Sequence, residues 1–319
     1  MNKNVKIYIA GHRGLAGSAI VRELQRQGYT NIVTRTHAEL DLEDAAATRH
    51  FFEQERPEIV FLAAAKVGGI HANNSYPVDF LMSNLLIEAN ICRAAHVTQV
   101  NRLVFLGSSC IYPRDCPQPI KEEYLLTGPL EATNRAYALA KIAGIEMCWS
   151  YNRQYGTKWL AAMPTNLYGP GDNYDLNNSH VLPALIRKMH EAKLSCATEV
   201  VLWGSGTPKR EFLYVDDLAN ALVFLATLDE GRYNALVEPS QCPLINVGTG
   251  TDLTIRELAE TVARVVGYKG KFVQDTSKPD GTMRKVMDVS KIQGLGWRAN
   301  TSLPEGITMT YKIFSEAHA

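Results

Sequence analysis

The stretch VKIYIAGHRGLAG, residues 5–17, decides the fold that this sequence predicts. Residues 5–10 have the composition of a strand, glycines stand at positions 11, 14 and 17, and residues 18–27 carry apolar side chains at helical spacing until Gly28. In such a strand–turn–helix unit, the glycines permit a tight turn, close approach of a pyrophosphate, and close packing of the helix on the strand. The helix N-terminus offers unpaired N–H groups to phosphates. The stretch therefore predicts a dinucleotide site.

The second predicted strand, residues 31–35, ends in Arg35, and this residue bears on which dinucleotide binds. NAD sites usually have an acidic residue there for the ribose 2′-hydroxyl, whereas an arginine accommodates a 2′-phosphate. Arg13, inside the glycine turn, is a second cation within reach, and Glu39 lies beyond the strand end. Both arginines could be solvated surface residues, but together they favour NADP(H).

Strand and helix patterns alternate through most of the chain. Further strands are predicted at residues 57–65, 102–106, 159–163 and 245–248, with helices at 45–54, 80–96, 138–150 and 255–266. The alternation predicts an α/β fold, a doubly wound parallel sheet (Rossmann) with a smaller C-terminal α/β substrate domain. We assign residues 1–170 and about 212–250 to the cofactor domain. Residues of about 171–211 and 251–319 are assigned to the substrate domain.

Two hydroxyls and a thiol follow the buried strand 102–106, in the segment LGSSCIYP at residues 106–113. Ligands bind beyond the carboxyl ends of the strands in such sheets, which places Ser108 and Cys110 where chemistry occurs. Tyr137 and Lys141 are four residues apart and share one helix face. A phenol titrates near pH 10 in water, and a nearby ammonium stabilises its anion. Tyr137 is thus a candidate acid for a carbonyl oxygen, with Ser108 as a hydrogen-bond donor.

The overall composition excludes several classes of protein. Lys and Arg together number 33, as do Asp and Glu, so no global field favours nucleic acid or an anionic membrane. No apolar run approaches the roughly 18–20 residues of a spanning helix, and the start leads into a strand rather than a signal peptide. The six scattered cysteines lack zinc spacing. We expect no metal, reduced thiols and a cytoplasmic location.

The glycine spacing resembles that of the extended branch of the short-chain dehydrogenase/reductases. Within that branch, eight stretches in the same order are similar to the GDP-L-fucose synthase family: residues 11–14, 63–70, 107–113, 141–144, 164–170, 178–181, 210–212 and 278–282. Members of that family invert C3 and C5 of GDP-4-keto-6-deoxy-D-mannose and then reduce C4 with NADPH. The resemblance implies this activity, with Ser108, Tyr137 and Lys141 as the reductase triad, Cys110 as the base that removes a proton and His180 as the acid that returns one.

The glycine turn, the strand ends and the resemblance together imply the binding residues. The cofactor residues are Gly11, His12, Arg13, Gly14, Leu15, Ala16, Gly17, Arg35, His37, Asp41, Leu42, Leu106, Gly107, Ser108, Ser109, Tyr137, Lys141, Pro164, Thr165, Asn166, Leu167 and His180. The substrate residues are Arg187 or Lys188, Trp203, Arg210 and Asp280. The resemblance and the apolar faces of helices 80–96 and 138–150 also imply a homodimer through a four-helix contact.

Three positions depart from the family pattern, and they leave more than one function open. Relatives often have Asn-Phe-His-Pro where this chain has NYDL at residues 173–176, an arginine at His37, and an uncharged or acidic residue at Arg135. The first departure leaves open a sister enzyme on another GDP-4-keto sugar, giving colitose or a heptose. A nucleotide-sugar epimerase or dehydratase that retains NAD also stays open, as does a non-catalytic NADP-binding protein.

Overall fold

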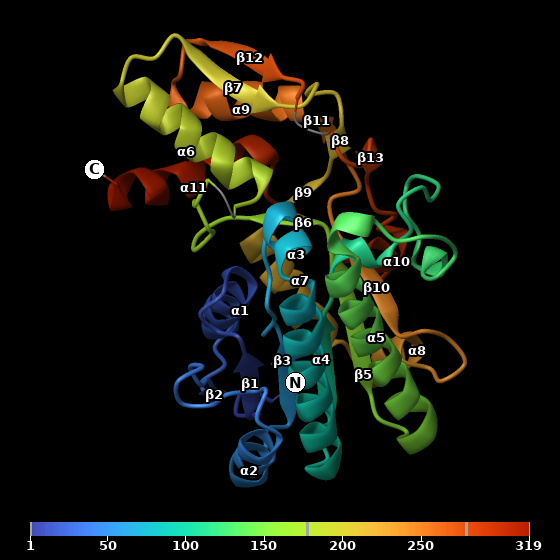
Figure 1. Cartoon of the computed structure of the whole chain (residues 1–319). Helices are drawn as coiled ribbons and strands as arrows, with labels where there is room; N and C mark the ends of the chain where they lie inside the picture. Colours follow the sequence, from blue (N-terminus) through green and yellow to red (C-terminus); the bar gives the residue numbers. More distant parts are fainter. Residues whose placement is uncertain (1, 177–178, 278–279, 319) are drawn as a thin grey trace.

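Six parallel strands form the central sheet in the computed structural model, which describes residues 2–176, 179–277 and 280–318 (Figure 1). Their order is β10-β5-β4-β3-β1-β2. The strands are β1 (Ile7–Ala10), β2 (Ile32–Val33), β3 (Ile59–Leu62), β4 (Arg102–Leu106), β5 (Trp159–Pro164) and β10 (Leu244–Val247). This confirms the predicted doubly wound parallel sheet.

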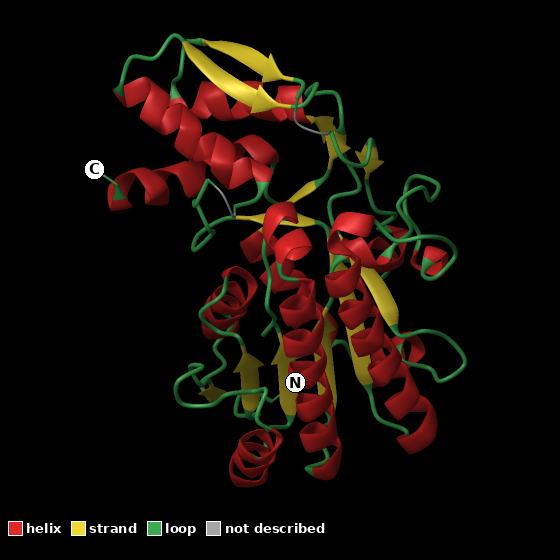
Figure 2. Cartoon of the chain, in the orientation of Figure 1, coloured by secondary structure: helices red, strands yellow, loops and turns green. Residues whose placement is uncertain are grey.

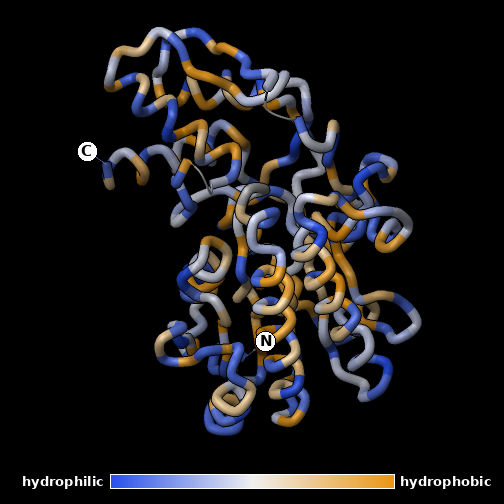
Figure 3. Tube along the Cα trace, viewed as in Figure 1, coloured by the Kyte–Doolittle hydropathy of each residue, from blue (hydrophilic) through white to orange (hydrophobic). Residues whose placement is uncertain are grey.

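Helices cover both faces of the sheet, and this burial explains the apolar strands. The helices are α1 (Leu15–Arg26), α2 (Ala45–Glu55), α3 (Ile70–Ser75), α4 (Pro77–Val97), α5 (Arg135–Tyr155), α7 (Val215–Thr227), α8 (Glu230–Leu236) and α10 (Ser290–Gly294). Helix α4 packs against α2 and α5, and α1 packs against α7. Figure 1 shows α4 and α5 in front of the sheet and α7 behind it. Figure 3 shows hydrophobic positions gathered along the strands.

The chain progresses away from β1 in two directions, first to β2 and then through β3, β4 and β5. Such a reversal is the switch point at which open α/β sheets bind ligands. The glycine turn lies there, and its backbone packing requires glycine. A Cβ at Gly11 would lie 2.7 Å from the Cα of Ala64, and one at Gly17 would collide with the carbonyl oxygen of Gly11. The first turn of α1 therefore lies directly on the ends of β1 and β3.

A second, smaller layer of elements lies over the carboxyl edge of the sheet (Figures 1 and 2). It contains β6 (Asn166–Tyr168), α6 (Val181–Leu194), β7 (Glu199–Trp203), β8 (Lys209–Arg210), β9 (Phe212–Tyr214), β11 (Leu253–Thr254), α9 (Ile255–Val266), β12 (Lys271–Asp275), β13 (Arg284–Lys285) and α11 (Leu303–Ala317). Its hydrophobic core is built mainly by α6, α9 and α11 with residues of β7 and β9. Residues Met287, Val289, Ile292 and Trp297 belong to the core of the larger layer. The assignment of residue ranges to two domains remains a prediction.

The predicted ends of several helices and strands differ from the structure by a few residues, among them those of β2 and α5. Strand β2 ends at Val33, so Arg35 lies beyond the strand and not at its last position. Helix α5 begins after Asn134, whose side chain makes no capping hydrogen bond. A short 3₁₀ turn, η3 (Ala132–Asn134), precedes the helix, and the Glu131 carboxylate accepts from the N–H of Thr133 instead. The predictions for Asn178 and for the Lys278–Pro279 turn lie outside the described residues.

Candidate active site

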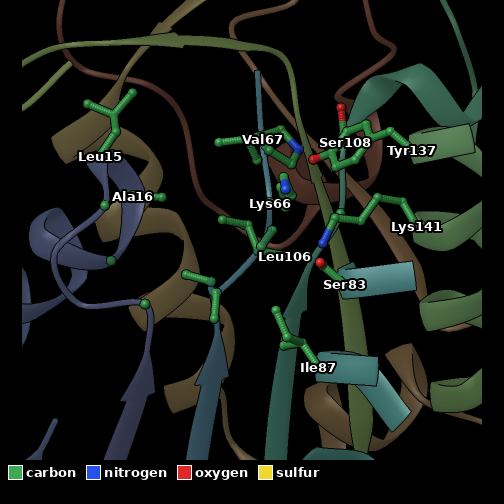
Figure 4. Close-up of a pocket in the computed structure, with 18 of the residues that line it drawn as sticks. Leu15, Ala16, Lys66, Val67, Ser83, Ile87, Leu106, Ser108, Tyr137 and Lys141 are labelled. Atoms are coloured by element: carbon green, nitrogen blue, oxygen red, sulfur yellow. The ribbon is translucent and has the colours of Figure 1, made fainter. Parts of the chain in front are cut away.

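A cavity of about 540 Å³ opens at the carboxyl edge of the sheet, where β1, β3, β4 and β5 end (Figure 4). Twenty of the predicted cofactor residues line it: Gly11, Gly14, Leu15, Ala16, Gly17, Arg35, His37, Asp41, Leu42, Leu106, Gly107, Ser108, Ser109, Tyr137, Lys141, Pro164, Thr165, Asn166, Leu167 and His180. The cavity is also lined by residues that the site prediction missed, namely Leu40, Glu43, residues 63–67, Ser83 and Ile87. The small side chains at 63–65 leave room above β3, as their composition indicates.

Two predicted cofactor residues, His12 and Arg13, do not line the cavity. The backbone turns through them, the Arg13 side chain is exposed, and Nδ1 of His12 is buried without a hydrogen-bond partner among the described residues. Arg35 does reach the wall, although its guanidinium also donates to Glu55 at 2.6 Å. Glu39 is absent from the wall, and its carboxylate accepts from the N–H of Thr36 at 2.7 Å. Of the two predicted phosphate-binding arginines, the geometry therefore supports Arg35 over Arg13.

Ser108, Tyr137 and Lys141 lie together on one wall of the cavity (Figure 4). Ser108 follows β4, and its hydroxyl is held by the N–H of Cys110, which donates to it at 3.4 Å. Tyr137 and Lys141 lie one turn apart on α5, with the Lys141 ammonium 5.8 Å from the centre of the Tyr137 ring. Burial raises the pKa of Tyr137 well above its ordinary value, helped by Cys110 and Glu88, whereas a hydrogen bond with Ser108 opposes the rise. The phenol is therefore held protonated, as an acid requires.

Cys110 lies in the short 3₁₀ turn η1 (Ser109–Ile111), buried beside the cavity rather than on its lining. Burial raises the pKa of the thiol, and three neighbours oppose this: Lys285, the hydroxyl of Ser108 and Lys141. His180 lies at the start of α6 and lines the cavity. Desolvation lowers the pKa of His180, which makes its protonated form a stronger acid. The two residues approach the cavity from different layers, since Cys110 follows β4 and His180 precedes α6.

Lys285 is a functional candidate that the sequence reasoning missed. It lies on β13, paired in parallel with Arg210 of β8, and the fields of Cys110, Arg210, Cys116 and Glu131 all act on its ammonium. Burial lowers its pKa. The only signal along the chain is that it follows the 278–282 motif by three residues, because its neighbours come from distant segments.

The predicted substrate residues lie on α6, β7 and β8 and, for Asp280, between β12 and β13, and none of them lines the cavity. The Lys188 ammonium lies 4.8 Å from the centre of the Trp203 ring, whereas Arg187 donates to Glu191 at 2.7 Å and to the carbonyl of Tyr174 at 3.1 Å. Asp280 accepts from the N–H of Ser205 at 2.7 Å. Burial lowers the pKa of Arg210, whose Nη2 lies 3.6 Å from an ideal Cβ at Gly281. Of the pair left open by sequence, Lys188 is the one that contacts Trp203.

The cavity suits a dinucleotide, and the described residues favour no other resident cofactor. Its glycine-lined floor admits backbone approach, and Arg35 supplies a cation beside Asp41 and Leu42. No group of three or more His, Cys, Asp or Glu within the described ranges is placed to hold a metal ion. None of the helices described is long and apolar enough to cross a membrane. A glycine turn, a Tyr-x-x-x-Lys helix and a serine at a strand end define a short-chain dehydrogenase/reductase site.

Comparison with known proteins places the chain within that class. The model of the NAD dependent epimerase/dehydratase family matches residues 7–236, and the chain belongs to this family. It is 57% identical to GDP-L-fucose synthase 1 of Arabidopsis thaliana over 97% of this chain and 93% of that protein. It is 56% identical to GDP-L-fucose synthase of Escherichia coli K12 over 98% of this chain and 97% of that protein. Among solved structures, the GDP-D-glycero-L-gluco-heptose synthase of Campylobacter jejuni, in the presence of NADPH, matches with a TM-score of 0.92, 39% identity and 99% coverage of both chains.

Proposed function

We propose that this chain is an NADPH-dependent epimerase-reductase that converts GDP-4-keto-6-deoxy-D-mannose to GDP-L-fucose. One observation carries the proposal: Ser108, Tyr137, Lys141 and His180 line one cavity, with Cys110 directly beside it. A reductase alone needs only the first three of these residues. A cysteine and a histidine that reach the same reacting centre from different elements add the base and acid that inversion of a carbon requires.

Epimerisation uses the acidity of carbons next to the C4 ketone. The Cys110 thiolate removes the proton from such a carbon, and His180 delivers a proton to the opposite face. The hydroxyls of Tyr137 and Ser108 hydrogen-bond the ketone oxygen and stabilise the enolate that forms between the two steps. Lys285 and Lys141 favour the thiolate of Cys110 by charge.

Reduction uses the same two hydroxyls, those of Tyr137 and Ser108, to bind the ketone oxygen. Gly11, residues 14–17 and Arg35 would hold NADPH, which would supply a hydride for C4. Tyr137 donates its proton to the C4 oxygen as the alcohol forms, and Lys141 stabilises the resulting phenolate and holds the ribose. The GDP moiety would meet Lys188, Trp203, Arg210 and Asp280, where the guanidinium of Arg210 offers a bidentate fork for a diphosphate.

The first test is NADPH oxidation with GDP-4-keto-6-deoxy-D-mannose, followed by identification of the product. Formation of GDP-L-fucose supports the reaction, cofactor and substrate together. NADPH binding without turnover of this sugar contradicts the substrate, and a panel of colitose- and heptose-pathway keto sugars then identifies the sister reaction. An enzyme that co-purifies with NAD and never oxidises NADPH contradicts the reductase proposal itself.

Arg35→Ser is expected to weaken NADPH binding by about 10- to 100-fold, because charge-assisted hydrogen bonds to the 2′-phosphate are lost. Binding of NADH, which lacks that phosphate, should change little. Calorimetric titration with NADPH and with NADH measures the two dissociation constants and their ratio. Arg13→Ser is the matched control: it removes an exposed arginine of the glycine turn that does not line the cavity, so its effect should be much smaller. Equal losses in the two variants would contradict the assignment to Arg35.

We also propose that the protein is a cytoplasmic homodimer joined through α4 and α5. Val78, Met82 and Leu86 recur every four residues on α4 and are 68%, 46% and 38% exposed, and Leu139 of α5 is exposed as well. The six cysteines are free, which suits a reducing compartment. Light scattering should give twice the chain mass, and Met82→Glu with Leu86→Glu should give a monomer. A wild-type monomer would rule out this dimer.

A further inference from the structure

A buried ion pair joins α4 to α5 directly behind the reductase residues. The Lys141 ammonium donates to Oε1 of Glu88 at 3.1 Å, and the two side chains are only 2% and 1% exposed. The second carboxylate oxygen, Oε2, is buried and has no hydrogen-bond partner within the described ranges. Glu88 does not line the cavity, and it contacts the active site through its hydrogen bond with Lys141.

The packing around this carboxylate is tight and largely apolar. A Cβ at Gly144 would lie 2.9 Å from Oε2 of Glu88 and would collide with the ring of Phe105. Lys141 passes over the same ring, 4.8 Å from its centre. A residue of α4 that faces α5 in such surroundings would ordinarily be apolar, and apolar replacement of a buried ion pair is often neutral or stabilising. A contribution to folding stability therefore explains poorly why a glutamate stands at position 88, and an effect on Lys141 explains it better.

The titratable groups that face the pair come from three elements. They are Tyr137 and Cys148 on α5, Cys92 on α4 and Cys110 on η1. Burial raises the pKa of each of these four groups, so each is mainly in its neutral form near neutral pH. Burial also raises the pKa of Glu88, but the adjacent ammonium opposes that shift. Glu88 is thus the counterion of Lys141.

We propose that Glu88 is a positioning residue for the reduction: it keeps Lys141 in the ammonium form and fixes that charge between Tyr137 and the cofactor ribose. An amine placed in this apolar contact without an anion would lose its proton more readily. The neutral amine could neither stabilise a developing phenolate nor donate as strongly to ribose hydroxyls. The inference rests on the proposed reductase function for its kinetic consequence, whereas the charge state of Lys141 is independent of any substrate.

Glu88→Gln is the test, because the amide keeps the shape and can still accept from Lys141 while its charge is gone. An opposite charge at this distance typically displaces a titration by about 1–3 pH units. In the variant, the Lys141 side chain lies beside a neutral amide, so the alkaline limb of kcat for reduction should move about 1–3 pH units lower. NADPH affinity should weaken over the same pH interval.

Lysine labelled with ¹³C at Cε reports the charge directly in the protein without substrate, and Lys141→Met identifies the resonance. The wild-type resonance should stay that of an ammonium across the pH range of activity; a neutral amine there contradicts the proposal even if the variant fails to fold. Glu88→Asp keeps the charge and should retain most of the wild-type pH profile. Glu23→Gln is a control, since Glu23 is a buried carboxylate bonded to Arg26, Gln27 and Asn220 and does not line the cavity, and its profile should be unchanged.

The outcomes separate this inference from the function on which it rests. A wild-type chain that binds NADPH but reduces no GDP-4-keto sugar defeats the proposed function, and the NMR titration still decides the role of Glu88. The inference alone is defeated if the wild-type chain reduces the sugar but Glu88→Gln leaves both the alkaline limb of kcat and the Lys141 resonance where they are in the wild type.

Discussion

Tyr137→Phe is expected to abolish C4 reduction, with kcat lower by about 10²- to 10⁴-fold, the usual contribution of a positioned general acid. The change removes a single hydroxyl, and the ring remains packed edge-on against Phe80, 6.3 Å away between ring centres. NADPH affinity should therefore change little. Stopped-flow measurement of NADPH oxidation gives the rate, and fluorescence titration gives the affinity.

The hydroxyl of Tyr137 is irreplaceable because no other described group stands in its position. Burial keeps it protonated, Ser108 orients it and Lys141 lies near enough to stabilise its anion. The remaining donor, Ser108, has too weak an acidity to replace a phenol whose anion an ammonium stabilises.

A matched control for this variant is Tyr233→Phe. Tyr233 is fully buried and its hydroxyl donates to the carbonyl of Lys158 at 3.0 Å, but it lies on α8 away from the cavity. Its loss should lower the melting temperature while the catalytic constants remain as in the wild type. Substantial C4 reduction by Tyr137→Phe would remove Tyr137 from the role of acid and direct attention to Ser108.

The sequence predicted the elements that local pattern controls. Strand β4 begins and ends where the apolar run 102–106 does, and α9 spans residues 255–266 as predicted, ending at Gly267 with φ of 78°. These elements carry their own signals: a continuous apolar run for a strand buried on both faces, and a strong amphipathic period with a glycine stop for the helix. The glycine turn likewise needs close backbone contacts that no other residue permits.

The residues that escaped prediction depend on contacts between distant segments. Glu88 meets Lys141 across 53 residues, and Lys285 meets Cys110 across a still longer interval. In the sequence, Glu88 is one of several polar residues in a largely apolar helix, and such a residue usually faces solvent. Arg13 illustrates the same limit, since a cation inside the motif predicts a phosphate contact, but its side chain is exposed off the cavity lining and that contact stays a prediction. Spacing identifies residues on one element and leaves contacts between elements undetermined.

Cys110→Ser is expected to reduce exchange of solvent deuterium into the keto sugar by about 10²- to 10⁴-fold, with a smaller effect on NADPH oxidation. A hydroxyl is a far weaker acid than a thiol, so serine offers almost no anion to remove the carbon-bound proton. The oxygen-binding group of Tyr137 and Ser108 is untouched, and C4 of sugar that has not been inverted can still be reduced. Mass spectrometry of the recovered sugar in deuterated water measures exchange.

The pH dependence of that exchange follows from the environment of the thiol. Because burial raises the pKa of Cys110, its thiolate is scarce at neutral pH, and exchange should grow with rising pH until the thiol has titrated. Lys285 is the neighbour that opposes burial most, so Lys285→Met should move this rise to higher pH. Cys116→Ser is the control, since Cys116 also lies in the field of Lys285 but is not a predicted base. Exchange that survives in Cys110→Ser with an unchanged pH profile would assign proton removal to another group, and His180, the remaining titratable residue predicted to act on the sugar, would then have to serve as the base.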